Sequence, residues 1–139
     1  MHKKQYIYIM GAGRSGTTAL ATFLGNNSQI LNLGEMHQYF EYLADNKKCS
    51  CGTQIVECEF WKNKISEYVL KSKDRNRILS EKMESHLSIF KHIVNSFSIT
   101  DYNKYIELHQ SILDSIQSDS EKSILIDSSK YIGRALALN

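Results

Sequence analysis

A glycine-rich loop near the amino terminus constrains the fold more than any other feature of this sequence. Residues 11–18 read Gly-Ala-Gly-Arg-Ser-Gly-Thr-Thr, directly after a β-prone apolar run at residues 6–10. The segment that follows, residues 17–24, has its apolar residues at helical spacing. A strand, a glycine loop and a helix in this order bring exposed backbone N–H groups and the positive end of a helix dipole together. The loop therefore predicts a binding site for a phosphate-like anion.

Two further β-prone runs, at residues 30–33 and 123–127, are separated by segments with a helical pattern. We expect residues 35–44 to contain a helix, residues 60–118 to be mostly helical and residues 129–138 to form a last helix. Strands that alternate with helices indicate an α/β fold, a three-layer, P-loop-like parallel sheet flanked by helices. Ligands of such sheets bind at the carboxyl ends of the strands, where the glycine loop lies.

Two apolar stripes in the helical middle predict buried helix faces. One repeats at steps of three and four residues and comprises Leu79, Met83, Leu87, Phe90, Val94 and Phe97. The other belongs to a helix that Asp101 is expected to cap, and comprises Tyr105, Ile106, His109, Ile112, Leu113 and Ile116. We interpret both stripes as core.

Length and charge narrow the classes of function. A chain of 139 residues with 42% apolar and 23% charged residues has the size and composition of one globular domain. Its formal net charge of +2 gives no overall field that would favour nucleic acid or a membrane surface. The run at residues 6–10 is too short for a signal-peptide core or a membrane span. We therefore expect a cytoplasmic protein with a local anion site and no nucleic-acid partner.

Three kinds of nucleotide site compete for the glycine loop. A nucleoside-triphosphate loop needs a lysine after its last glycine, where this chain has Thr17. A dinucleotide loop needs an acidic residue about 20 residues further on, and Glu35 keeps that alternative open. However, Arg14, Ser15 and the two threonines place a cation and hydroxyl donors beside the backbone amides, which suits a terminal phosphosulfate. The polar set therefore favours a phosphosulfate.

Three segments of the chain resemble sulfotransferases. Residues 14–18, Arg-Ser-Gly-Thr-Thr after an apolar strand, are similar to the 5′-phosphosulfate loop of that family. Residues 49–61, with Cys-Ser-Cys-Gly and Cys-Glu-Phe-Trp, and residues 126–138, with Ile-Asp-Ser-Ser-Lys and Arg-Ala-Leu-Ala-Leu, resemble its bacterial members. Residues 62–122 carry no recognised motif, and we expect them to form a helical insert of the single domain that binds the acceptor.

The resemblance implies an activity and a donor. A sulfonate group would move from 3′-phosphoadenosine 5′-phosphosulfate to a hydroxyl or amine of a small molecule, carbohydrate or other acceptor, leaving adenosine 3′,5′-bisphosphate, with no metal required. The donor would be held by the loop residues Gly13, Arg14, Ser15, Gly16, Thr17 and Thr18.

The resemblance also implies catalytic residues. Glu35 resembles the catalytic glutamate of the tyrosylprotein branch and would accept the acceptor's proton. Lys130 looks like the active-site lysine that stabilises leaving-group charge. His37 is a second candidate base. The alternatives are a surface or capping carboxylate for Glu35, a solvent-exposed lysine for Lys130 and a structural histidine for His37.

Two charged residues near the last strand have less specific expectations. We expect Asp127 to orient Ser128 and Ser129 rather than to hold magnesium, because the glycine loop lacks its lysine. Arg134 would either pair with a phosphate or cover its helix, and the sequence leaves both open.

Cys49, Cys51 and Cys58 are an odd set close together in the sequence, which is not a secreted disulfide framework. A zinc site would need a fourth ligand such as His37 or His86. Buried thiols or a local disulfide are the simpler interpretation, and we expect no metal site.

Full sulfotransferases resemble one another in a later strand and helix that bind the nucleotide's 3′ phosphate through an Arg-x-Pro segment, and this chain has no proline. We therefore expect an incomplete fold, either a truncated chain or one half of a split protein, that binds donor weakly and turns over little. The alternatives are another P-loop or Rossmann nucleotide-binding enzyme and a non-catalytic nucleotide-binding module.

Overall fold

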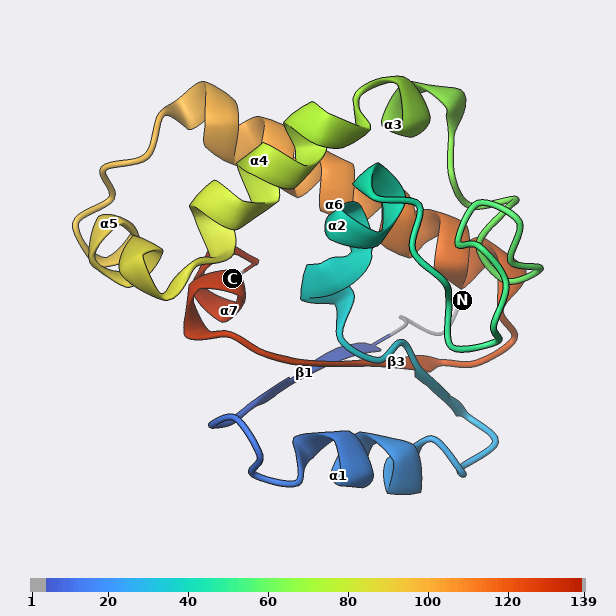
Figure 1. The fold of residues 1–139 in the computed structure, drawn as a ribbon. Coiled ribbons are helices and arrows are strands. Elements are labelled where there is room, and N and C mark those ends of the chain that lie inside the picture. The colour runs from blue at the N-terminus through green and yellow to red at the C-terminus, as the bar shows by residue number, and fades with distance from the viewer. Residues whose placement is uncertain (1–4, 139) are drawn as a thin grey trace.

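The computed structural model describes residues 5–138, and a small parallel sheet organises this part of the chain (Figure 1). Its strands are β1 (Gln5–Met10), β2 (Ile30–Asn32) and β3 (Ile124–Lys130). They pair in parallel in the order β1-β3-β2, so the last strand in the sequence is the central one. The predicted mixed α/β fold with a parallel sheet is confirmed.

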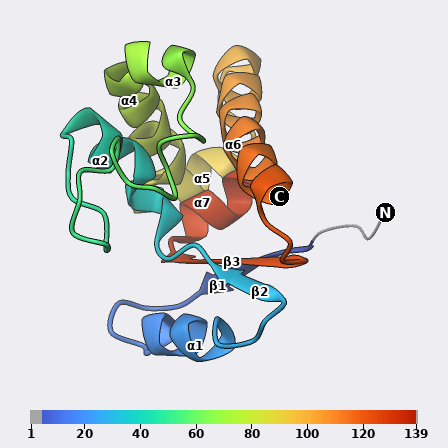
Figure 2. The same ribbon diagram turned by 90° about the vertical axis from the view of Figure 1, so that its right-hand side faces the viewer.

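Helices lie on both faces of the sheet (Figure 2). Helix α1 (Thr17–Leu24) covers one face, and the helices between β2 and β3 lie over the other. Crossovers between parallel strands are right-handed, and these two run across the sheet in opposite directions, which places their helices on opposite faces. The helical elements on the second face are η1 (Met36–Gln38), α2 (Tyr39–Ala44), α3 (Glu67–Lys71), α4 (Lys73–Glu84), η2 (His86–Ser88), α5 (Ile89–Ile93), α6 (Ile99–Asp119) and, after β3, α7 (Ile132–Ala137).

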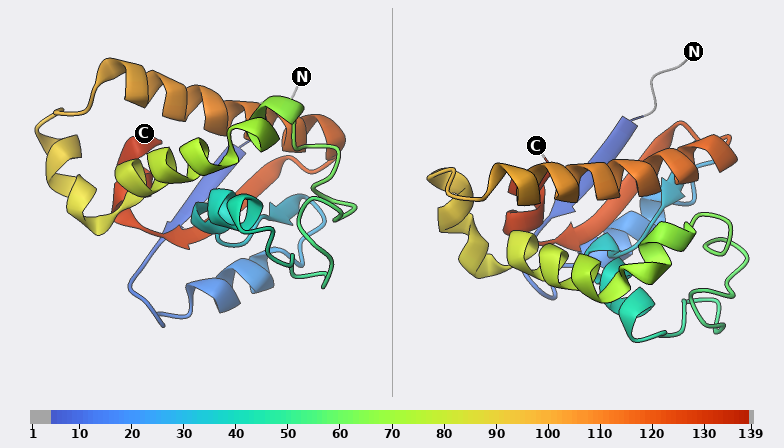
Figure 3. Two further views of the ribbon diagram at one scale, coloured as in Figure 1. Left: turned by 45° about the horizontal axis from the view of Figure 1, so that its top comes forward. Right: turned by 90° about the horizontal axis from the view of Figure 1, so that it is seen from above.

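The core lies between the sheet and the second helical layer. Phe40 of α2, Ile112 and Ile116 of α6 and Leu125 of β3 are almost completely buried in one cluster. A second, smaller cluster joins α4, α6 and α7, and Figure 3 shows α4 and α6 lying alongside each other above the sheet. The apolar side chains removed from water at these contacts hold the helices to the sheet.

Helix α6 confirms one predicted stripe. Its buried residues include Tyr105, His109, Ile112 and Ile116, at the expected three- and four-residue steps. The helix begins at Ile99, so the expected cap at Asp101 is wrong. Asp101 lies instead in the first turn, where it accepts a hydrogen bond from Lys82 at 2.5 Å.

The other stripe is only partly buried. Leu79 and Met83 of α4 belong to the core, whereas Leu87, Phe90 and Val94 are 85%, 75% and 69% exposed. The prediction assumed one continuous helix, but α4 ends at Glu84 and the following Ser85 has an extended backbone (φ −60°, ψ 155°). The change of direction at Ser85 breaks the periodicity and turns Leu87, Phe90 and Val94 away from the core, whereas Phe97 packs against the second cluster as a partly buried residue.

The end of α4 is closely covered by α7. Gly133 of α7 lies so near that a Cβ there would be 2.5 Å from the carbonyl oxygen of Glu84 and 2.7 Å from that of Ser85. Only a residue without a side chain allows this approach. Helix α7 begins at Ile132 rather than at the predicted residue 129, because β3 continues to Lys130.

A buried charge network connects β3, α4 and α7. Arg134, 1% exposed, donates from Nε to Oδ2 of Asp127 at 2.9 Å and from Nη1 to Oε1 of Glu84 at 2.5 Å. The hydroxyl of Tyr105 donates to Glu84 at 2.7 Å, and that of Tyr6 donates to Asp127 at 2.5 Å. Both expectations for Arg134 are therefore wrong, because its guanidinium binds two core carboxylates instead of a phosphate or the surface of its helix.

Acid is expected to destabilise the folded chain through this network. Burial and the nearby Arg134 charge lower the pKa of His109 below its ordinary 6.5, so the unfolded chain binds an extra proton as the pH falls below about 6.5. Burial alone would raise the pKa of Glu84, but Arg134 and the surrounding donors outweigh it and lower the value from 4.5 to about 2. Stability from Glu84 is therefore full above about pH 4.5 and is lost as the pH falls toward 2.

Urea unfolding at a series of pH values tests this expectation. Each proton taken up on unfolding lowers the free energy of unfolding by up to about 1.4 kcal/mol per pH unit. His109→Gln should reduce the slope just below pH 6.5, while a slope below pH 4.5 should persist, because Arg134 is the largest of the causes that lower the pKa of Glu84 and it remains. Part of the pH dependence just below pH 6.5 should remain in this variant, because burial also lowers the pKa of His37. A free energy of unfolding that stays constant from pH 7 to pH 3 would contradict the prediction.

Candidate functional site

The glycine loop opens the site at the carboxyl end of β1. Gly16, the residue before α1, has φ +81°, and Arg14 has φ +62°, a conformation that few residues other than glycine adopt. No side chain caps the amino terminus of α1, so its first-turn amides make no capping bond. The Oγ1 of Thr17 is buried and has no hydrogen-bond partner among the described residues. Amides and a hydroxyl are therefore free to bind an anion here.

The ends of β2 and β3 bring a carboxylate and an ammonium group to this loop. Glu35 pairs with Lys130, and both side chains are about a quarter exposed. The same carboxylate accepts a hydrogen bond from Oγ1 of Thr18 at 3.4 Å and one from Nε2 of Gln38 at 3.2 Å. Lys130 has φ +71°, an unusual conformation for a lysine. Backbone strain of this kind concentrates at functional sites.

All three predicted catalytic residues line one cavity of about 250 Å³. Its walls include Gly11 and Gly13 of the loop and the side chains of Glu35, His37 and Lys130. The predicted donor-binding loop and the predicted catalytic residues are thus adjacent, although the chain separates Glu35 from Lys130 by 95 positions. Their roles in catalysis stay predictions.

His37 is held in this cavity by its backbone and its ring. Its N–H donates to Oγ of Ser129 at 2.9 Å, and its ring lies 4.4 Å from that of Tyr131, centroid to centroid. The ring nitrogen Nδ1 is buried without a hydrogen-bond partner in the described chain. Burial lowers the pKa of His37, against the opposing charge of Glu35, so the imidazole is neutral near pH 7. A neutral imidazole can accept a proton.

The buried charge network is connected to the cavity through Asp127 and Ser129. Asp127 accepts hydrogen bonds from the N–H, at 2.9 Å, and the hydroxyl of Ser129, which in turn binds His37. The expectation that Asp127 orients Ser129 is confirmed. The same expectation for Ser128 is wrong, because its Oγ is buried without a partner. The chain Arg134, Asp127, Ser129, His37 therefore links the core to the site.

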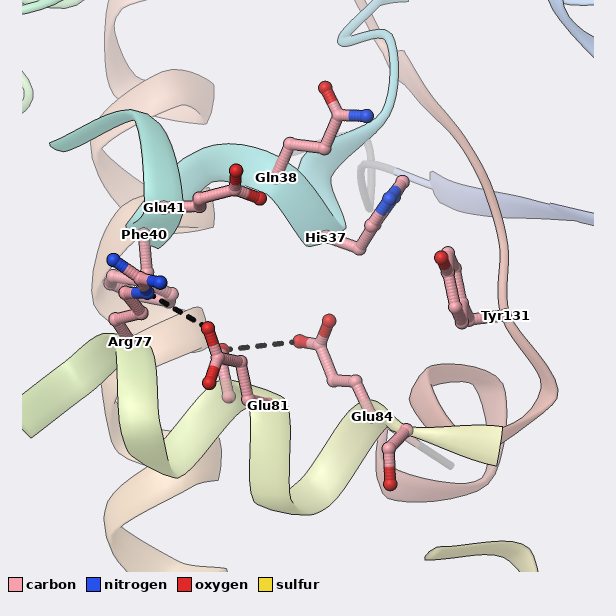
Figure 4. Close-up of a pocket in the computed structure, with 10 residues that line it drawn as sticks. His37, Gln38, Phe40, Glu41, Arg77, Glu81, Glu84 and Tyr131 are labelled. Atoms are coloured by element: carbon pink, nitrogen blue, oxygen red, sulfur yellow. Dashed lines mark hydrogen bonds and ion pairs between the residues drawn. The ribbon is translucent and has the colours of Figure 1, made fainter. Parts of the chain in front are cut away.

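A larger cavity of about 350 Å³ adjoins the first (Figure 4). The two share His37, Gln38 and Tyr131. Helix α4 contributes Arg77 and Glu81, which form an ion pair at 2.8 Å, drawn as a dashed line in the figure. Arg77 and Glu81 could not be predicted as lining residues, because residues 62–122 carry no recognisable motif. Only the position of Tyr131 directly after Lys130 could have pointed to that residue.

The cysteines form a separate cluster in the segment between α2 and α3. Sγ of Cys58 lies 3.5 Å from that of Cys51 and 3.6 Å from that of Cys49. All three are free thiols, so the expected alternative of a local disulfide is not what the structure contains. A hydrogen bond with Thr53 is the main cause that lowers the pKa of Cys51 to about 7. His37 and His86 were the expected candidates for a fourth zinc ligand. Neither of them belongs to this cluster of potential metal ligands in the described chain.

Within residues 5–138 no helix has the length and apolar character needed to cross a membrane. No family model, no curated protein and no solved structure matches this chain.

Proposed function

We propose that this chain carries the 5′-phosphosulfate site of a sulfotransferase, which moves a sulfonate group from 3′-phosphoadenosine 5′-phosphosulfate to an acceptor hydroxyl or amine. One observation carries the proposal. A carboxylate and an ammonium group, those of Glu35 and Lys130, pair at the wall of a cavity that Gly11 and Gly13 of the glycine loop also line. Sulfonate transfer needs these three parts together: a donor site, a proton acceptor and a cation near the leaving group.

The loop supplies the donor site. A phosphosulfate is an anion, and the uncapped amides of α1 together with the positive end of its dipole favour it. The unpartnered hydroxyl of Thr17 and the exposed guanidinium of Arg14 add donors of the kind that bind phosphate and sulfate oxygens. Position 17 carries no lysine, which disfavours a nucleoside triphosphate.

The ion pair supplies the transfer chemistry. The acceptor oxygen or nitrogen forms a bond to sulfur while the bond from sulfur to the bridging oxygen breaks. Glu35 takes the acceptor's proton, and the electron pair of the broken bond leaves with the 5′ phosphate of the bisphosphate product. Lys130 stabilises the charge that develops on that bridging oxygen.

The cavity of about 350 Å³ supplies a place for the acceptor. It shares His37 with the cavity that the loop lines, so an acceptor there would reach the sulfur from the side of Glu35 and His37. Its wall on α4 carries both signs of charge, on Arg77 and Glu81, which suits a polar acceptor. Helix α4 lies in residues 62–122, the segment proposed to select the acceptor.

Calorimetric titration with adenosine 3′,5′-bisphosphate tests the donor site. Arg14→Ala is expected to weaken binding by about 10- to 150-fold, because a hydrogen bond to a charged group contributes about 1.5–3 kcal/mol. Arg75→Ala is the matched control, since it removes the same charge from an exposed position on α4 and should leave the affinity unchanged.

Comparing the affinities for different nucleotides distinguishes between classes of enzyme. Preference for ATP with magnesium would indicate a kinase-like or ATPase-like site, and preference for NAD would indicate a dinucleotide site. Either preference, or equal binding by wild type and Arg14→Ala, would contradict the proposed function.

A further inference from the structure

The segment between α2 and α3, residues 45–66, is long and irregular, yet it contributes to the core. It contains no helix or strand, only an isolated bridge between Lys48 and Gln54. Nevertheless Ile55 and Trp61 are buried in the main core cluster. Loops longer than about 12–15 residues without secondary structure are uncommon in compact domains. A segment of this kind needs some other constraint to hold it in one conformation.

The cysteine cluster lies within this segment and has the spacing of metal ligands. The sulfur atoms of Cys49, Cys51 and Cys58 all lie within 4.8 Å of one another, two of the distances being 3.5 Å and 3.6 Å. Tetrahedral zinc binds thiolates at about 2.3 Å, which places two ligand sulfurs about 3.8 Å apart. The two distances to Cys58 need to change by only a few tenths of an ångström to hold one ion, and the third pair, no more than 4.8 Å apart, by at most about 1 Å.

The backbone holds the three thiols from two directions. Cys49 and Cys51 lie in a tight turn closed by hydrogen bonds from Cys49 N to Thr53 O and from Gly52 N to Cys49 O, both at 2.8 Å. Gly52 has φ +91°, which that turn requires and glycine permits. Cys58, itself buried, opens a separate turn, where its carbonyl accepts from the N–H of Trp61 at 2.9 Å. The exposed turn and the core thus meet at the sulfurs.

We propose that Cys49, Cys51 and Cys58 bind one zinc ion as three thiolates, with a water or other small ligand in the fourth position. Three sulfur ligands select a soft or borderline metal over magnesium or calcium. No further histidine, cysteine, aspartate or glutamate joins this cluster among the described residues, which leaves the fourth position open. The ion joins the turn at Cys51 to the core at Cys58 and so orders the segment.

The site has a structural role and takes no part in sulfonate transfer. Cys49 and Trp61 line a cavity of about 290 Å³ whose wall also includes Gly34 and Glu35. Zinc bound at the cysteines would therefore order part of the surface beside Glu35. The proposal holds whether or not the chain binds a phosphosulfate, because it rests on the cysteine cluster alone.

Cobalt titration of the reduced, metal-free full chain tests the proposal. We expect saturation at one equivalent, with thiolate-to-cobalt charge transfer in the near ultraviolet and the visible bands of tetrahedral cobalt, and displacement by one equivalent of zinc. Zinc should also protect all three thiols from alkylation and raise the unfolding temperature.

Two variants in the exposed turn make the test specific. Cys51→Ser should weaken zinc binding by more than about 100-fold. Even the loss of a group that only hydrogen-bonds to a metal ligand typically weakens binding by about 10- to 100-fold. The variant should remain folded by circular dichroism, because Cys51 is exposed. Ser50→Ala, its neighbour in the turn, should bind zinc like the wild type.

Three results would overturn the proposal. The first is a folded, reduced chain that takes up no cobalt or zinc, or takes up cobalt with an octahedral spectrum. The second is equal zinc affinity in Cys51→Ser and the wild type. The third is an affinity that persists unchanged in denaturant, which would show that the thiols bind metal without the folded cluster.

Discussion

Replacing Arg134 by methionine is expected to lower the free energy of unfolding by about 3–5 kcal/mol. The side chain is 1% exposed and is the cation between Asp127 and Glu84, themselves fully or almost fully buried. Without it two carboxylates remain in the core with only neutral donors around them. Their desolvation is then uncompensated, which costs far more than the loss of one surface ion pair. Urea unfolding followed by circular dichroism measures the change.

Arg77→Met is the matched control for this measurement. Arg77 also contacts two carboxylates, Glu81 at 2.8 Å and Asp45 at 3.0 Å, but it is 38% exposed. Its loss should cost no more than about 1 kcal/mol. The free energy of unfolding of Arg134→Met should also rise as the pH falls toward 4.5, because protonating Glu84 relieves the buried charge. Equal effects of the two substitutions would contradict the role assigned to the network.

Glu35→Gln is expected to slow sulfonate transfer by about 100- to 10,000-fold, the contribution of a positioned general base. Binding of adenosine 3′,5′-bisphosphate should be unchanged or tighter, because the substitution frees Lys130 from its ion pair and removes a negative charge near the anion site. Transfer is measured as bisphosphate released from saturating donor with a panel of hydroxyl and amine acceptors. Binding is measured by calorimetry.

Two further variants separate a catalytic carboxylate from a structural one. Glu67→Gln removes the carboxylate of an exposed glutamate–lysine pair, Glu67 with Lys71 at 2.7 Å, and should change neither rate nor affinity. Lys130→Met should lower both the rate of transfer and the affinity for the nucleotide, since it removes a cation that would contact the nucleotide. If Glu35→Gln weakened nucleotide binding as much as Arg14→Ala, Glu35 would be a residue that shapes the site and not its base.

The parts of the site that are local in the sequence could be predicted. The loop at residues 11–18 lies between a strand and a helix as expected, and α1 has the predicted bounds, Thr17–Leu24. The stripe on α6 is buried as expected. In each case a short-range pattern was enough, because a strand followed by glycines and a helix with an apolar face are encoded by neighbouring residues.

Other features depended on where distant segments meet. The stripe that includes Leu87 and Phe90 failed, because α4 ends against α7 at Gly133 and the chain turns there. The role of Arg134 could not be predicted, because its two partners lie on other elements. Asp127 is on β3, and Glu84 is on α4, 50 positions away in the sequence. The cavity wall on α4 had no signal, since Arg77 and Glu81 look like any ion pair on a helix surface.

The sequence by itself determined the glycine loop, the elements on either side of it and the cationic and hydroxyl residues of the loop, on which the proposed anion site depends. Only the tertiary structure decided that Glu35 pairs with Lys130, that Arg134 lies in the core and that three cysteine sulfurs converge. The physical reason is one of range. Backbone preferences and apolar periodicity act between neighbours, whereas pairing of side chains depends on the order of the strands and on the crossovers that bring their ends together.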